Sequence, residues 1–192
     1  MIDGEAKHRF LLSKTFAHAA VAYLVKRYSE VGDNKLGRTI LQKLCYFTKA
    51  SGVPLPFRFE MYHYGPFCQE IFDVTDNLIV DDVVQDTAEA QARSYYAPGP
   101  NCTRLLDRAK RQLHAHQRAL DEVVETFSGL DVSQMELVST IHYIHNSYRN
   151  WHKDRPSKEQ VVNSVLETKK GKFEANFVDK VYDILMDARL LN

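Results

Sequence analysis

Apolar side chains recur at steps of three and four along most of the second half of the chain, a period that indicates α-helices. One long helix is expected from Thr103 to Phe127, where Ser128-Gly129 ends it. Its apolar seam, a heptad-like pattern, comprises Leu106, Ala109, Leu113, His116, Leu120, Val123 and Phe127. The pattern leaves open two arrangements, packing inside the chain and a homodimer through the Leu106–Phe127 helix.

Three shorter helices are expected after this one. Ser133 and Ser157 each precede Glu or Gln by three residues, the capping-box pattern that begins a helix. The last helix spans Phe173 to Leu191. The side chains that its period predicts to be buried are Phe177, Val181, Ile184, Leu185 and Ala188.

The first hundred residues mix helices with short strands. Helical periodicity predicts helices over Lys14–Tyr28 and Leu36–Ala50, and alternation of apolar and polar residues predicts a strand over Phe57–Tyr64. Pro66 suits the first turn of a helix, where its missing N–H has no partner. A helix is therefore expected over Phe67–Leu78.

A hairpin is expected between Ile79 and Tyr96, and Pro98-Gly99-Pro100 marks a break. This order of elements resembles a permuted winged helix. The expected fold is therefore α+β and predominantly α-helical. Residues 1–100 form a winged-helix-like part with a small sheet or hairpin. Residues 101–192 form a helical C-terminal part packed on it as one compact domain.

Charge is unevenly distributed along a chain whose 25 basic and 25 acidic residues cancel. Residues 59–92 contain no Lys or Arg, and their eight acids are Glu60, Glu70, Asp73, Asp76, Asp81, Asp82, Asp86 and Glu89. A winged helix usually reads DNA with the helix before its hairpin, but phosphates repel an acidic helix. The segment is therefore either a solvated acidic face or a docking surface for a basic protein, since complementary charge orients association.

Basic residues gather on the predicted long helix, at Arg104, Arg108, Lys110, Arg111 and Arg118. A solvated helix face explains them with fewest assumptions, because Asp107 and Asp121 lie on the same helix. The alternative is a winged-helix DNA-binding transcriptional regulator that uses this helix, and it predicts binding that weakens steeply with salt.

The sequence carries no recognisable catalytic or cofactor motif, and we expect a non-enzymatic protein without cofactor or metal. His142 and His145 have the i, i+3 spacing of two metal ligands, but no third ligand stands at a recognisable spacing. Cys45 lies on an apolar helix face and is expected in the core. Cys68 is expected at a helix start, which would favour its thiolate, yet no His partner is evident.

Two sets of residues resemble the Panacea domain, a family that includes SocA-like antitoxins and YwgA-like proteins. They are Leu41-Gln42-Lys43-Leu44-Cys45-Tyr46-Phe47 and Tyr64-Gly65-Pro66-Phe67 with the acidic helix after it. The resemblance covers about residues 15 to 100. Leu137–Tyr143 and the Lys172-Phe173 helix look similar to YwgA-like members. The resemblance implies a mostly helical domain that binds a partner protein, neutralises a toxin by direct contact or acts as an adaptor, and brings no catalytic residues.

A partner-binding surface is expected around the Tyr-Gly-Pro-Phe motif, because exposed tyrosines beside acids are typical of protein interfaces. Its expected residues are Tyr62, Tyr64, Phe67, Glu70, Asp73 and Asp76. Gln42 and Lys43 are expected to be structural. The partner is expected to be a protein, such as a basic toxin, rather than nucleic acid or a membrane, in the reducing environment of the cytoplasm.

Overall fold

The computed structural model describes residues 10–31, 35–89, 93–152 and 155–191. Helices dominate it, with a small three-stranded antiparallel sheet and a separate two-stranded hairpin. The predicted α+β class is therefore confirmed. The chain forms two compact units, which are described separately. Unit 1 contains the described residues up to Phe57 together with Gln69–Gly129, and unit 2 contains Arg58–Cys68 together with the described residues from Leu130 onward.

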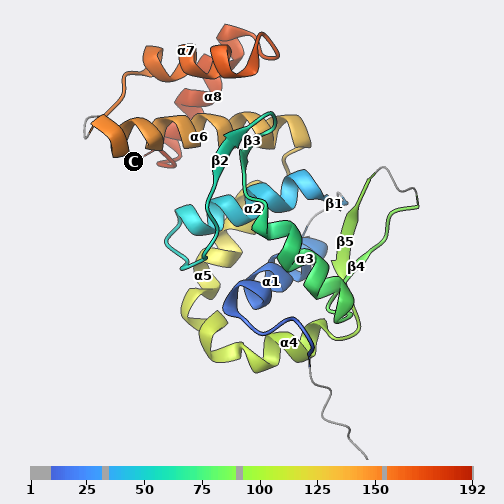
Figure 1. Ribbon diagram of the computed structural model, residues 1–192. Helices are drawn as coiled ribbons and strands as arrows, with labels where there is room; N and C mark the ends of the chain where they lie inside the picture. The colour runs from blue at the N-terminus through green and yellow to red at the C-terminus, as the bar shows by residue number, and fades with distance from the viewer. Residues whose placement is uncertain (1–9, 32–34, 90–92, 153–154, 192) are drawn as a thin grey trace, which may run out of the picture. The chain divides into compact units, whose positions relative to one another are not determined.

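Unit 1 is built around α1, which contacts the other helices of this unit and the sheet (Figure 1). Its elements are α1 (Phe16–Val31), β1 (Leu36–Gly37), α2 (Arg38–Ala50), α3 (Glu70–Val80), β4 (Val84–Asp86), β5 (Tyr95–Pro98), α4 (Cys102–Arg108) and α5 (Lys110–Phe127). All strand pairs of the sheet are antiparallel, in the order β1-β5-β4. Helix, strand, two helices and a two-stranded wing in this strand order are the arrangement of a winged helix. In that arrangement α3 takes the place of the recognition helix.

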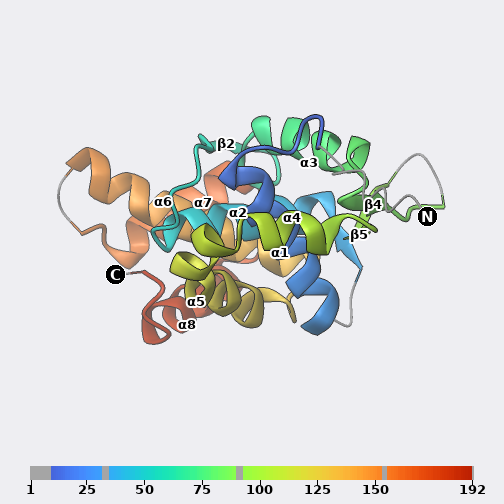
Figure 2. The ribbon, with the colours of Figure 1, turned by 90° about the horizontal axis from the view of Figure 1, so that it is seen from below.

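The predicted long helix is interrupted at Ala109, which separates α4 from α5. Leu105 of α4 and Leu113 of α5 are both buried, and both helices contact α1. Each of the two helices thus contributes a buried apolar side chain to unit 1, one on either side of the interruption. Figure 2 shows the unit from the side on which α4 lies. The seam positions Leu113, Leu120, Val123 and Phe127 are buried inside the chain.

Because α4 and α5 contact α1, the predicted boundary at residue 100 falls inside unit 1. Two smaller differences concern the wing and the start of α2. Leu36 and Gly37 form a strand with β5 instead of the first helical turn. The predicted hairpin is present. Because α3 continues to Val80, the hairpin strands β4 and β5 begin and end a few residues later than expected.

Unit 2 consists of a short hairpin and three helices. Its elements are β2 (Glu60–Tyr62), β3 (Gly65–Phe67), α6 (Val132–His152), α7 (Lys158–Lys169) and α8 (Ala175–Asp187), and β3 contacts α6. The expectation that Pro66 begins a helix is wrong, because Pro66 lies in β3 and pairs with Met61 of β2. Proline is tolerated there because the strand is short and has a free edge.

The two capping-box predictions had different outcomes. At Ser157 the box is confirmed: Gln160 N donates to Ser157 Oγ at 3.2 Å, and Ser157 N donates to Gln160 Oε1 at 2.8 Å. At α6 the box begins at Asp131 instead of Ser133. Gln134 N donates to Asp131 Oδ1 at 2.8 Å and Asp131 N donates to Gln134 Oε1 at 2.9 Å. Aspartate is as good an N-cap as serine, so the helix begins two residues earlier.

Helix α8 buries only part of the face that was predicted. Leu185 is buried as expected, together with Val178 and Tyr182, whereas Phe177 and Ile184 are exposed. Both faces of this helix carry apolar residues at helical spacing, so periodicity alone does not choose between them. No helix among the described residues combines the length and the apolar character needed to cross a membrane.

Candidate functional site

The predicted acidic residues lie together on the outer face of α3. Glu70, Asp73 and Asp76 are exposed at three-residue spacing. The opposite face of the helix, with Ile71 and Leu78, is buried in unit 1. Glu70 and Asp73 lie in the first turn, where negative charge stabilises a helix. Asp76 lies beyond that turn, so stabilisation of the helix end does not account for all three acids.

One acid of the 59–92 segment has a structural role instead. Asp81 is 4% exposed and accepts hydrogen bonds from the backbone N–H groups of Leu11, Leu12 and Ser13 at 2.9, 3.0 and 2.6 Å. Burial acts to raise the pKa of this carboxyl, but the donors outweigh it and hold the pKa below its ordinary value. Asp81 therefore fastens the segment before α1 to the end of α3.

The predicted aromatic residues lie on the β2–β3 hairpin of unit 2. Tyr62 and Tyr64 are 59% and 61% exposed. Phe67 is half-buried, with its ring centroid 5.5 Å from that of Tyr62. The six predicted contact residues thus divide equally between the two units, with the three aromatics on unit 2 and the three acids on unit 1.

A buried ion pair fastens the hairpin turn to the helices of unit 2. Lys169 Nζ donates to the backbone oxygen of His63 at 2.8 Å and lies 3.0 Å from Glu136 Oε1. Lys172 Nζ donates to Glu136 Oε2 at 2.6 Å and lies 5.6 Å from the centroid of the Tyr64 ring. Burial lowers the pKa of Lys169, and the neighbouring Glu136 carboxylate opposes that shift. The sequence had suggested only a capping role for Glu136.

Gly65 allows the turn to lie directly on α6. Its φ is +88°, a left-handed conformation that favours glycine. A Cβ at this position would lie 2.9 Å from Thr140 Oγ1 and 3.1 Å from Ser139 Oγ. The Tyr-Gly-Pro-Phe motif therefore combines a tight turn with a close helix contact and two exposed tyrosines.

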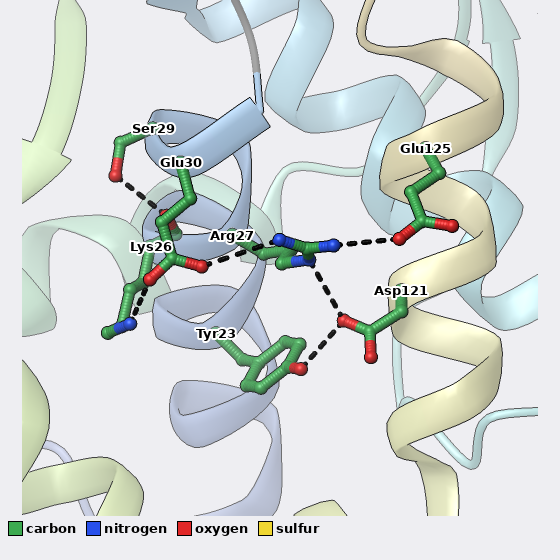
Figure 3. Close-up of polar contacts among 7 residues, drawn as sticks. All are labelled: Tyr23, Lys26, Arg27, Ser29, Glu30, Asp121 and Glu125. Atoms are coloured by element: carbon green, nitrogen blue, oxygen red, sulfur yellow. Dashed lines mark hydrogen bonds and ion pairs between the residues drawn. The ribbon is translucent and has the colours of Figure 1, made fainter.

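A polar network joins α1 to α5 inside unit 1 (Figure 3). The Tyr23 hydroxyl donates to Asp121 Oδ1 at 2.7 Å, and Arg27 lies 3.2 Å from Asp121 and 2.7 Å from Glu125. Burial and the bond to Asp121 raise the pKa of Tyr23 to about 12. The phenol thus stays protonated at neutral pH, and the network holds two helices together.

The residues weighed for catalysis and metal binding are buried. His142 is 7% exposed, and burial next to His145 lowers its pKa to about 4. His145 is fully buried beside Tyr182, whose hydroxyl lies 3.4 Å from Nδ1. Cys45 is in the core as predicted, and Cys68, the residue that follows β3 in the chain, is also buried. Among the described residues no group of three or more His, Cys, Asp or Glu could hold a metal ion.

The basic residues of α4 and α5 are all exposed: Arg104, Arg108, Lys110, Arg111 and Arg118. Two of these side chains interact with neighbouring residues through their positive charge. Arg118 Nε donates to Glu122 at 2.7 Å, and the Arg108 guanidinium lies 5.2 Å from the Phe10 ring centroid. The interruption at Ala109 also divides these cations between two helices.

The motif residues on α2 serve the core, as predicted. Gln42 and Lys43 are 3% and 2% exposed.

A comparison with protein-family models found no match to this chain, and a comparison with curated proteins found no significant match. What the chain does is therefore inferred from its residues and their geometry.

Proposed function

We propose that this protein is a non-enzymatic module that binds a basic partner protein through the outer face of α3. The observation that carries the proposal is the position of that face. In a winged-helix arrangement α3 is the helix that would enter a DNA groove, and here its outer side presents Glu70, Asp73 and Asp76. The same three carboxylates that repel phosphates attract and orient a basic protein surface.

The wing supports the same conclusion. No Lys or Arg occurs between Arg58 and Arg93, so neither α3 nor β4 offers a cation to the DNA backbone. A winged helix that binds DNA neutralises several phosphates with such cations. The acidic α3 and wing therefore favour a protein partner over DNA.

The β2–β3 hairpin provides a second contact surface, on unit 2. Tyrosines that expose most of their ring are enriched at protein interfaces because they bury a large area at little entropic cost. Tyr62 and Tyr64 are of this kind, and the ion pair beneath the turn keeps it in place. Half-buried Phe67 supports the Tyr62 ring.

The resemblance to Panacea-domain proteins suggests the biological role within this proposal. Neutralisation of a toxin by direct contact, or an adaptor role, would each use an acidic surface against a basic partner in the cytoplasm. Both roles need binding without a chemical reaction. His142 and His145, which were considered as metal ligands, and Cys68, which was considered for its thiolate, are buried.

The test reverses the charge of the α3 face. Glu70→Lys, Asp73→Lys and Asp76→Lys are combined, and binding of the partner isolated with the wild-type chain is measured. We expect a loss of at least about tenfold in affinity, because attraction becomes repulsion at three neighbouring positions. A matched control combines Glu159→Lys, Glu167→Lys and Glu174→Lys, three exposed acids of unit 2 that change the net charge equally. Unchanged binding by the α3 variant, or an equal loss in the control, would contradict the proposal.

The second candidate function is DNA binding through α4 and α5. It is favoured by one observation, the exposure of all five basic residues on these helices. It predicts duplex DNA binding that falls by orders of magnitude between low and moderate salt. It also predicts that Arg104→Ala with Arg111→Ala lowers the slope of that dependence. Absent or salt-insensitive DNA binding would eliminate it.

A further inference from the structure

Helix α8 exposes an apolar stripe along the face that unit 2 does not cover. Phe177 and Ile184 are 46% and 63% exposed, Val181 between them is half-buried, and Ala188 at the helix end is exposed. Their spacing of four, three and four residues places them on one side of the helix. The helix already buries Val178, Tyr182 and Leu185 within unit 2, so the stripe is a second apolar face.

Two opposite charges flank this stripe. Lys180 and Asp187 are both exposed and seven residues apart, two helical turns, so they lie on the same edge of the stripe. We find no ion pair to either side chain among the residues that the structure describes. The other acids near the middle of the helix are already engaged, since Lys158 Nζ lies 2.7 Å from both Asp179 and Asp183.

We propose that the α8 stripe binds the same stripe of a second copy of this chain, with the two helices antiparallel. A two-fold axis that lies between the two helices, perpendicular to both and level with the midpoint of Lys180 and Asp187, reverses the direction of the partner helix but keeps each edge opposite itself. Lys180 of one copy then faces Asp187 of the second copy, and the same pair forms again about 10 Å along the helix. The stripe is thus complementary to itself, as a two-fold interface requires.

The charge pattern also selects the antiparallel arrangement. In a parallel pair of α8 helices the two-fold axis runs along the helices, so the edge that carries Lys180 and Asp187 would face the opposite edge of the partner stripe, and neither charge would meet an opposite charge of this pair. Ile184, the most exposed apolar residue of the stripe, lies next to the axis, where interface residues are most fully desolvated. One helix face is a small interface, so we expect a weak dimer whose population rises with concentration.

The experiment is sedimentation velocity over a concentration series, with the full chain and single charge reversals. Lys180→Glu places two acids opposite each other at both ends of the interface, and Asp187→Lys places two lysines there. Each single variant should dimerise about tenfold more weakly than wild type. An equimolar mixture of the two single variants, and the double variant Lys180→Glu/Asp187→Lys, should dimerise as wild type does, because every opposed pair is again of opposite sign.

Two matched substitutions test whether the apolar residues of the α8 stripe form the dimer contact. Ile184→Glu should abolish the dimer, and Val132→Glu, at a residue of unit 2 that is 47% exposed, should not. Circular dichroism confirms that each variant is folded. A wild-type chain that stays monomeric throughout would overturn the proposal. So would single reversals that dimerise as wild type does, the result expected of a parallel pair or of another surface.

Discussion

The carboxylate of Glu136 and the ammonium of Lys169 lie 3.0 Å apart, with 1% and 2% of their side chains exposed. Lys169 also donates to the backbone of His63, at the turn that presents Tyr62 and Tyr64. The ion pair thus connects the α6–α7 core of unit 2 to the exposed aromatic hairpin. In the proposed function it positions a contact surface without touching the partner.

Removal of Glu136 should strongly destabilise unit 2. Glu136→Ala leaves Lys169 buried without a counter-charge, which typically costs about 3–5 kcal/mol of unfolding free energy. Lys172→Ala should cost less than about 1 kcal/mol, because Lys172 is 42% exposed and leaves the Glu136–Lys169 pair intact. Urea denaturation followed by fluorescence of Trp151, the single tryptophan and part of α6, measures both. Equal losses of unfolding free energy in the two variants would contradict the claim that the buried Glu136–Lys169 pair stabilises unit 2 more than the exposed Lys172 does.

Gly65→Ala should separate the hairpin turn from α6. The new methyl would lie 2.9 Å from Thr140 Oγ1, and the positive φ adds strain. Gly52 is the matched control, since its φ is +92° and nothing lies within 4 Å of a Cβ built there. Gly52→Ala should cost only the backbone strain, about 1 kcal/mol, and Gly65→Ala about 1–3 kcal/mol more. Thermal unfolding of the two variants measures the difference, and similar melting temperatures would contradict the close contact.

Acidification should destabilise unit 2 through His142. Its pKa is about 4 in the folded chain and about 6.5 when unfolded, so only the unfolded chain gains this proton between those values. The stability from neutral His142 is therefore complete above about pH 6.5 and lost as pH falls through about 4, a change of roughly 3 kcal/mol. His142→Leu should flatten the stability profile in this window. Exposed His114 is the control, and His114→Leu should leave the profile unchanged.

Asp81→Ala should release the segment before α1. Three backbone N–H groups lose their acceptor, and partly buried donors left without one cost about 1–3 kcal/mol in total. Asp76→Ala removes an exposed acid of the same segment and should change stability by less than about 0.5 kcal/mol. Hydrogen exchange should show faster exchange at Leu11, Leu12 and Ser13 in the first variant alone. Unchanged exchange there would contradict the anchoring role.

The sequence predicted best where one local signal had no competitor. The capping box at Ser157, the buried face of α3 and the core position of Cys45 follow from spacing and composition, and all are present. These signals act within a few residues along the chain. They do not depend on which distant segment packs against them.

The predictions that failed depend on packing between distant residues. Pro66 suits both a helix start and a strand edge, and the close fit of Gly65 on α6 decides for the strand. The apolar spacing runs through Ala109 without a break, yet the structure divides this segment into α4 and α5, which both contact α1. The buried ion pair joins residues 33 positions apart, Glu136 and Lys169, and no local pattern reveals it.

The proposed function requires that the chain binds a protein and not a nucleic acid. The most direct measurement is affinity capture of the tagged chain from its native lysate, with and without nuclease, followed by mass spectrometry and absorbance at 260 nm. We expect to capture a near-stoichiometric basic protein that is retained after nuclease treatment and is lost with the Glu70→Lys, Asp73→Lys and Asp76→Lys variant. Nucleic acid that copurifies with the chain and disappears at higher salt, with no protein retained after nuclease, would contradict it and place function on the basic residues of α4 and α5.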